Sequence, residues 1–241
     1  MSRAELPVIE IFGPTIQGEG KLCGHRTHFI RLGGCTYRCS WCDTMYAVDP
    51  VEVKKNAKWM TLQEICESIL KLPPSPWITL SGGDPLMHGD KVYHLMRNLR
   101  GHGFKVAIET QGAFYYDWLC QASLVTVSPK PPSSGMAEKF DAQVMTQYYQ
   151  AWLAGADVNI KVVVFDIRDM DFAEELHSHY PGMPFYVSVG TPQGLTAEET
   201  VLDIREALVS TIGNLLRRRR MSDVIILPQM HAIIWPKRKG V

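Results

Sequence analysis

The sequence predicts an α/β fold: a partial, open βα barrel of the TIM type. Short apolar runs rich in β-branched residues alternate with helical patterns along the 241 residues, and parallel strands need such crossover segments. The runs are nearly continuous in apolar residues, as in strands that are buried on both faces. Roughly six or seven βα units are visible, fewer than the eight of a closed barrel of about 250 residues. We expect a single domain over residues 1–241.

The apolar runs are the expected strands. They are THFIRL (27–32), WITL (77–80), KVAIE (105–109), LVTV (124–127), NIKVVVF (159–165), FYVSV (185–189) and DVIILP (223–228). Two of the helical patterns begin with the spacing of a capping box, Thr61 with Glu64 and Thr196 with Glu199. The N-terminal segment and residues 43–60 are expected to be long loops.

The composition favours a globular protein with a small-molecule partner. Hydrophobic residues make up 46% of the chain, and 25 basic residues balance 25 acidic ones. Zero net charge gives no general attraction to nucleic acid or to an anionic membrane. No apolar run approaches the ~18 residues of a membrane span, and the N-terminus has no apolar signal core. We therefore expect a cytoplasmic protein, in which the run Arg217 to Arg220 is a solvated helix end or an interface.

Three cysteines, Cys35, Cys39 and Cys42, stand close together in LGGCTYRCSWCDT. In a reducing cytosol they are thiols, metal ligands or catalysts rather than disulfides. Structural zinc usually takes four protein ligands, and ferredoxin clusters take four thiolates. Three thiolates on a short loop can instead hold three corners of a four-iron, four-sulfur cube and leave one iron open. Taken alone, the triplet leaves a zinc site as an alternative.

The C-x3-C-x2-C spacing resembles the signature of the radical S-adenosylmethionine enzymes, and Trp41 before the last cysteine matches that pattern. The resemblance implies a 4Fe-4S cluster whose open iron binds the amino and carboxylate groups of S-adenosylmethionine. It also implies reductive cleavage of that cofactor to a 5′-deoxyadenosyl radical. The remaining cysteines, Cys23, Cys66 and Cys120, are expected to lie outside the cluster.

Three unusual sequences follow predicted strands: SGGDP after WITL, ETQG at the end of KVAIE, and SPKPPSS after LVTV. Because the carboxyl ends of parallel strands share one edge, they should meet at one mouth. Gly82 and Gly83 let backbone N–H groups approach a ligand, and Glu109 needs a donor if it is buried. In the radical enzymes a GGEP sequence contacts the methionine amino group. Asp84 replaces its glutamate here, and the role of Asp84 is left open.

The two ends of the chain offer further polar groups. FGPTIQGEG (12–20) fits neither a Rossmann nor a Walker pattern, but Gln17 and Glu19 can present an amide and a carboxylate to a nitrogen heterocycle. Arg31 offers a two-pronged donor to a carboxylate. His231 lies on or just after the last expected strand, where a structural role and a functional role are equally open.

Together, EIFGPTIQGEG, FIRLGGCTYRCSWCDT, TLSGGDP, ETQG, SPKPP and PQMHAIIW resemble the 7-carboxy-7-deazaguanine synthases of Gram-positive type, nearly from end to end. The resemblance implies that 6-carboxy-5,6,7,8-tetrahydropterin loses ammonia and becomes 7-carboxy-7-deazaguanine, a step toward queuosine. It further implies a magnesium ion, a homodimer, and a reductant of flavodoxin or ferredoxin type.

The same resemblance assigns roles to individual residues. The cluster ligands would be Cys35, Cys39 and Cys42, and Thr44 would take the magnesium position. The residues around S-adenosylmethionine would be Trp41, Cys42, Asp43, Gly82, Gly83, Ser128, Pro129 and Lys130. The substrate positions would be Ile16, Gln17, Gly18, Glu19, Arg31, Ser81, Glu109, His231 and Val241.

Two other functions remain as alternatives. A glycyl-radical activase has the same cysteine spacing, but activases resemble C-H-N-P after the last cysteine, where this chain has Asp43 and Thr44. A non-catalytic iron–sulfur or zinc protein would account for the cysteines alone. It would leave SGGDP, ETQG and the loop with Gln17 and Glu19 without a common purpose.

Overall fold

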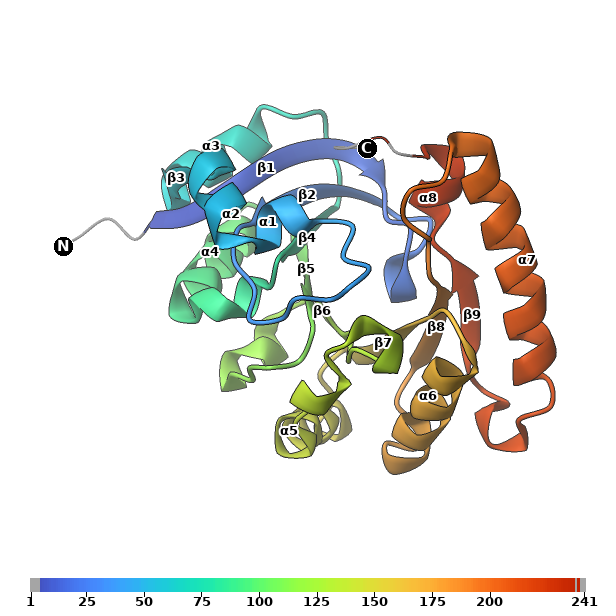
Figure 1. Cartoon of the computed structure of the whole chain (residues 1–241). Coiled ribbons are helices and arrows are strands. Elements are labelled where there is room, and N and C mark those ends of the chain that lie inside the picture. Colours follow the sequence, from blue (N-terminus) through green and yellow to red (C-terminus); the bar gives the residue numbers. More distant parts are fainter. Residues whose placement is uncertain (1–4, 237, 239–241) are drawn as a thin grey trace.

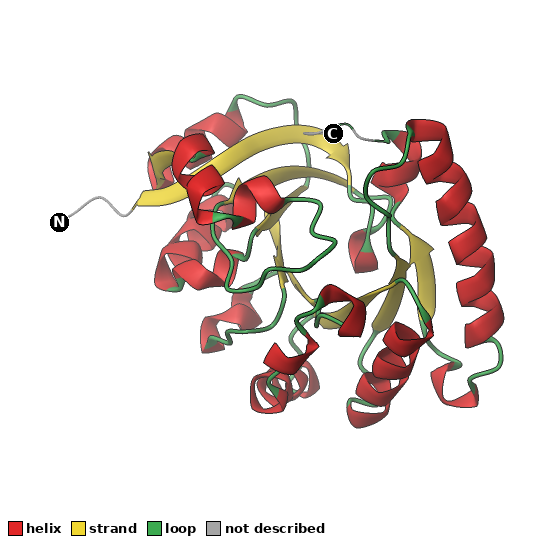
Figure 2. Cartoon of the chain, in the orientation of Figure 1, coloured by secondary structure: helices red, strands yellow, loops and turns green. Residues whose placement is uncertain are grey.

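The computed structural model describes residues 5–236 and residue 238. Within these residues a nine-stranded sheet has the order β3-β1-β2-β4-β5-β6-β7-β8-β9. The sheet curls into an arc with the long helices outside it (Figure 1), and its two ends do not pair. Figure 2 shows the same strands and helices coloured by type. The predicted open βα barrel is therefore confirmed.

The strands, in chain order, are β1 (Glu5–Ile16), β2 (Arg26–Leu32), β3 (Lys58–Thr61), β4 (Trp77–Gly82), β5 (Lys105–Thr110), β6 (Leu124–Val127), β7 (Val158–Val164), β8 (Phe185–Val189) and β9 (Ile225–Pro228). The helices are α1 (Met45–Val48), α2 (Pro50–Asn56), α3 (Leu62–Leu70), α4 (Asp90–Gly101), α5 (Ala142–Leu153), α6 (Ile167–His179), α7 (Ala197–Leu215) and α8 (Met230–Ile234). No helix in the described ranges is both long enough and apolar enough to cross a bilayer.

Every predicted strand is present, and the pairs from β2 through β9 are parallel. Both predicted capping boxes also form, at Thr61 before α3 and at Thr196 before α7. Each box satisfies backbone N–H groups that the first helical turn leaves without partners. These helices therefore begin where the sequence pattern places them.

The expected N-terminal loop was wrong, because β1 forms there and pairs antiparallel with both β2 and β3. Residues 43–60 likewise hold α1, α2 and most of β3. Leu6 and Val8 of β1 are buried in the main core, but Pro7 and the pair Gly13 and Pro14 interrupt the apolar run. The register of β1 against β2 shifts between Phe12 and Thr15, and proline is tolerated at such irregularities.

The two faces of the sheet have different roles. Residues such as Leu80, Ile160 and Val162 belong to the main core beneath the helices. Side chains that alternate with them point to the inner face of the arc, where Arg31 of β2 lies opposite Ser81 of β4 in the register. At the other end of the barrel, toward the start of the strands, Leu22 packs with Ala107 and Leu124. The inner face is therefore closed by apolar groups at one end and polar toward the strand carboxyl ends.

A short segment joins the two ends of the open sheet. It runs from Gln17 to Cys23 and includes a 3-10 turn at Gly20–Leu22 that contacts β7 and β8. The Met230 N–H donates to the carbonyl oxygen of Gly18 at 3.1 Å. A Cβ on Gly18 would lie 2.6 Å from Nδ1 of His231, so glycine permits this approach. The segment thereby connects the end of β1 with the region after β9.

The cysteine segment is fixed to the end of β4 by backbone contacts. Gly83 N–H donates to the carbonyl oxygen of Leu32 at 3.0 Å, and Asp84 N–H donates to that of Gly34 at 2.7 Å. A Cβ on Gly82 or Gly83 would lie 2.0 or 2.1 Å from those same oxygens. The expected reason for the glycines, N–H groups open to a ligand, was therefore wrong for Gly83. Its N–H already holds the segment that carries the cysteines.

We predict that Gly83→Ala displaces this segment, because the new methyl group has no room beside Gly34. Iron content after anaerobic reconstitution should fall, and the free energy of unfolding in urea should decrease by about 1–3 kcal/mol. Gly101→Ala at the end of α4 is the matched control, since its Cβ would meet nothing within 4 Å. Normal iron content and stability in Gly83→Ala would contradict this account of the glycine.

Candidate active site

The cysteine triplet lies on the segment between β2 and α1, and all three residues are free thiols. Tyr37 N–H donates to Sγ of Cys35 at 3.3 Å, and Cys42 N–H donates to the carbonyl oxygen of Cys39 at 3.2 Å. Burial raises the pKa of Cys39 to about 11. The charge of Lys130 opposes this rise, and the nearby Cys35 and Cys42 add to it. Three thiols on one short loop need a strong cationic partner before they ionise together.

The donor set fits an iron–sulfur cluster. Among the described residues, no three His, Cys, Asp or Glu side chains are close enough to hold one metal ion, so a site for structural zinc is not formed there. In a cluster each thiolate holds a different iron, which suits three separated thiols on one short loop. Three ligands would leave one iron open to a cofactor.

The loop after β6 supports the cysteine segment from the side. The Ser40 N–H donates to the carbonyl oxygen of Ser134 at 2.9 Å. The Nε1–H of Trp41 donates to Oγ of Ser133 at 3.0 Å. Lys130 donates to Ser128 Oγ at 3.0 Å, and its Nζ lies 5.8 Å from the centroid of the Trp41 ring. Trp41, Ser128, Pro129 and Lys130, which the sequence assigns to the cofactor, therefore come together beside the cysteines.

Asp84 links the cysteine segment to the end of β5. It is fully buried, and its carboxylate accepts hydrogen bonds from Leu86 N–H at 2.9 Å, from the Thr110 hydroxyl at 2.9 Å and from Gln111 N–H at 3.2 Å. Burial raises its pKa to about 6 against these bonds. The Gln111 side chain then donates to Thr36 Oγ1 at 3.1 Å. Asp84 thus uses both carboxylate oxygens within the protein.

The N-terminal segment places Gln17 beside Glu109. The buried Gln17 amide donates to Oε1 of Glu109 at 2.8 Å, and its own oxygen accepts from Glu19 N–H at 3.2 Å. Glu109 therefore has the donor that its position called for. Ile16 ends β1 just before this pair, and Gly18 packs against His231 just after it.

Glu19 forms a buried ion pair with Lys161 of β7 and also accepts a hydrogen bond from the Gln229 side chain. Burial alone would raise the pKa of Glu19, but the charges of Lys161 and His231, with both hydrogen bonds, lower it to about 2. The sequence analysis missed Lys161. Its signal was a single cation in the otherwise apolar run NIKVVVF, since a buried charge requires a partner.

Arg31 is also paired within the protein. Its Nε donates to Oε1 of Glu10 at 2.5 Å, and the Tyr46 hydroxyl donates to the same oxygen at 3.0 Å. Burial opposes the charge of Arg31, but Tyr46, Glu10 and Asp43 raise its pKa above the ordinary value. Glu10 was missed because β1 was not expected. Ser81 lies opposite Arg31 in the sheet, so both side chains share the inner face.

The remaining expected site residues are distributed around this mouth. Thr44 precedes α1, and its hydroxyl lies 3.7 Å from Sγ of Cys42. Asp43, exposed, lies between those two residues. Val241 lies outside the described residues. The thiol of Cys23 lies 3.1 Å from the sulfur of Met230.

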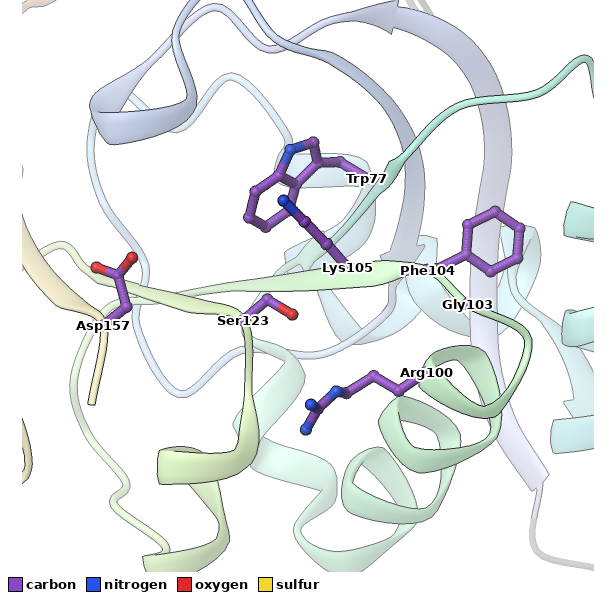
Figure 3. A pocket seen from close by; sticks show the side chains of 7 residues that line it. All are labelled: Trp77, Arg100, Gly103, Phe104, Lys105, Ser123 and Asp157. Atoms are coloured by element: carbon purple, nitrogen blue, oxygen red, sulfur yellow. The ribbon is translucent and has the colours of Figure 1, made fainter. Parts of the chain in front are cut away.

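A recess of about 480 Å³ lies elsewhere, between the ends where β4, β5 and β7 begin. Figure 3 shows Trp77, Lys105 and Asp157 around it. In a βα barrel the chemistry collects at the opposite, carboxyl ends of the strands. The recess is therefore separate from the cysteine triplet and from the Gln17 and Glu109 pair.

Comparison with known proteins gives the family. The Radical SAM superfamily model matches residues 29–128. A 7-carboxy-7-deazaguanine synthase of Bacillus cereus is 39% identical over 99% of this chain and 100% of its own length, and one of Bacillus subtilis is 37% identical over 98% of both chains. The chain belongs to the 7-carboxy-7-deazaguanine synthase family. The crystal structure of QueE from Escherichia coli, 22% identical with a TM-score of 0.68, covers 94% of this chain and 95% of its own and shares the fold.

Membership in the 7-carboxy-7-deazaguanine synthase family makes the chain a radical S-adenosylmethionine enzyme. The relatives span the whole chain, so the match is not confined to the cysteines. The alternatives of a glycyl-radical activase and of a non-catalytic iron or zinc protein are therefore not favoured. The matched superfamily region runs from β2 to the start of the loop after β6.

The low pKa of Glu19 gives a prediction about stability. A carboxyl group whose pKa falls from 4.5 to about 2 on folding stabilises the protein fully above pH 4.5 and loses this effect as the pH falls toward 2. The loss amounts to about 3 kcal/mol. As the pH falls between these values, the free energy of unfolding in urea should decrease more steeply for the wild type than for Glu19→Gln. Parallel curves for the two proteins would contradict the shift.

Proposed function

We propose that this chain converts 6-carboxy-5,6,7,8-tetrahydropterin to 7-carboxy-7-deazaguanine with loss of ammonia, in the cytoplasm, as a step toward queuosine. The observation that carries the proposal is that the cysteine triplet and the pair of Gln17 and Glu109 occur at the same polar mouth of a chain from this family. A cluster on Cys35, Cys39 and Cys42, with bound S-adenosylmethionine, would supply the radical chemistry. A flavodoxin or ferredoxin type protein would supply the electron.

The polar groups at the mouth suit the two ends of the pterin. Its 2-amino-4-oxo edge needs an acceptor beside a donor, which Glu109 and Gln17 provide in contact with each other. Its carboxylate needs a cation or a metal ion, for which Arg31 is held charged and oriented by Glu10. A magnesium ion on the Thr44 hydroxyl would keep several waters and take the substrate carboxylate as a further ligand. One domain would carry all of these groups.

The first test is anaerobic turnover of the pterin, read by mass spectrometry. The wild type should form 7-carboxy-7-deazaguanine and release ammonia. Alanine at Cys35, Cys39 or Cys42 should remove the brown colour or leave a defective cluster and stop cleavage of S-adenosylmethionine, because each thiolate would hold one iron. Cys66→Ala is the control, since Cys66 is buried in α3. Failure of the wild type to convert the pterin would refute the proposed function.

The magnesium proposal predicts a selective effect of Thr44→Val. This change removes a hydroxyl oxygen at nearly constant volume. It should therefore raise both the magnesium concentration needed for half-maximal activity and the KM for the pterin by about tenfold. Binding of S-adenosylmethionine should change little. Activity that is equal with and without magnesium in the wild type would count against a metal ion at this position.

We further propose that the chain is a homodimer formed through α7. Apolar side chains recur on its outer side at intervals of seven: Leu202, Val209 and Leu216 are 56%, 67% and 81% exposed, with Ile212 between them. The face toward the sheet buries Thr200, Ile204 and Thr211. This seam at seven-residue spacing suits a second helix, and α7 lies on the outside of the barrel (Figure 1).

The charges along α7 favour a second copy in antiparallel orientation. The exposed acidic side chains Glu198 and Glu199 lie in its first turn, and the exposed Arg217, Arg219 and Arg220 follow its C-terminal end. A two-fold axis near Val209 would bring each acidic end beside the basic end of the other copy. The arginine run would then belong to an interface.

Val209→Glu should therefore produce a monomer, because it places two carboxylates together at the centre of the seam. Sedimentation would show a halved mass at micromolar concentration with circular dichroism unchanged. Ser210→Glu, exposed on the next position of the same helix, should leave the mass unchanged. A monomeric wild type, or a dimeric Val209→Glu, would exclude this interface.

A further inference from the structure

Lys161 is the one cation in β7, a strand whose residues are all buried. Its side chain is 9% exposed and lies on the inner face, because it alternates with the core residues Ile160 and Val162. An ammonium group in this place without a partner would be strongly destabilising. Its partners therefore decide what the residue does.

Lys161 pairs with Glu19, on the segment that joins the two ends of the sheet and contacts β7. The second carboxylate oxygen of Glu19 accepts from the Gln229 side chain after β9. Gln229 in turn accepts from the Thr191 hydroxyl at 2.5 Å. Both oxygens of Glu19 are thus taken by groups of the protein.

Glu19 controls the orientation of Gln17. The Glu19 N–H donates to the amide oxygen of Gln17 at 3.2 Å, so the amide nitrogen of Gln17 faces Oε1 of Glu109 at 2.8 Å. From the described part of the chain, no hydrogen bond reaches the other oxygen of Glu109. The carboxylate oxygen left for a ligand is therefore on Glu109, whereas Glu19 is committed to Lys161 and Gln229.

We propose that Lys161 is a positioning residue: by pairing with Glu19 it fixes the segment from Gln17 to Glu19, and thereby orients the Gln17 amide and the Glu109 carboxylate toward the substrate heterocycle. The inference rests on the proposed function. Glu19 then acts through the protein and does not contact the pterin. This separates the two glutamates that the sequence leaves equivalent.

Removing the ammonium group should change how Glu19 titrates. The groups that act on Glu19 are Lys161 from β7, His231 and Gln229 near α8, and the Cys23 thiol in its own segment. Glu109 and Asp43 also act on Lys161. Without Lys161, burial would dominate and the carboxyl of Glu19 would bind a proton at higher pH. The orientation of the Gln17 amide and the Glu109 carboxylate would then depend on pH.

The test compares Lys161→Met, Glu19→Gln and the double variant with the wild type in anaerobic turnover. Lys161→Met should raise the KM for the pterin about tenfold or more, while the KM for S-adenosylmethionine and the iron content stay within about twofold. Its kcat/KM should show a new ionisation at roughly pH 5 to 8, absent from the wild type and from the double variant. Lys105→Met, at the opposite end of the barrel, is the matched control and should behave as wild type.

An unchanged KM for the pterin in Lys161→Met would overturn the proposal. So would equal losses of iron, cofactor affinity and pterin affinity, which indicate only a structural role. If Lys161→Met does not fold, the double variant, which lacks both charges, should fold and keep the raised KM without the new ionisation. A wild-type KM there would overturn the proposal.

A wild type that does not convert the pterin would refute the proposed function instead, and urea midpoints would still test the pair. The double variant should unfold at a higher urea concentration than either single variant, because it leaves no buried charge alone. Additive effects on the midpoint would show that Lys161 does not hold Glu19.

Discussion

The contact between the end of β4 and the start of the cysteine segment determines where the chemistry takes place. Two backbone hydrogen bonds, to Leu32 and Gly34, are made at a separation that excludes any side chain on Gly82 or Gly83. Because the cysteines follow Gly34 directly, their loop inherits its position from the sheet. A rigid strand end thus places three thiols that a free loop would leave poorly defined.

Asp84 extends this constraint to the neighbouring strand. Its buried carboxylate joins the 3-10 turn after β4 to Thr110 and Gln111 at the end of β5. Gln111 then holds Thr36 inside the cysteine segment. A glutamate would be longer by one methylene, so the aspartate found here is suited to contacts within the protein. The acidic residue of SGGDP therefore uses both carboxylate oxygens to connect the strand ends.

Most of the charges at the mouth are paired before any ligand binds. Arg31 is held by Glu10, and Glu19 is held by Lys161. Such pairing keeps the groups ionised in a partly dry environment and fixes their direction, which lowers the cost of ordering them when a substrate arrives. Glu109 differs, because its partner Gln17 is neutral. Glu109 therefore has a neutral hydrogen-bond partner, and the charge of Lys161 acts on it without a hydrogen bond between them.

The sequence was sufficient for the parallel strands and for the strand ends that meet at the mouth, because buried strands need continuous apolar runs such as NIKVVVF. It was insufficient for β1, whose prolines interrupt the apolar pattern. The pairing of Lys161 with Glu19 spans 142 positions, and no local spacing specifies such a contact. Motifs predicted which residues carry chemistry, but only the fold shows which of them are already paired with an opposite charge.

An open sheet has to exclude water from its interior without a strand to close it. Here the segment from Gln17 to Cys23 fills the gap, with an apolar part at one end of the barrel and a polar part at the other. Leu22 packs against Ala107 and Leu124 and seals the side where the strands begin, while Gln17 and Glu19 turn polar groups toward the carboxyl ends. The segment is anchored to the last strands through Gly18 and Glu19 rather than by sheet pairing. The same few residues that close the barrel therefore also lie beside Glu109 at the end of β5.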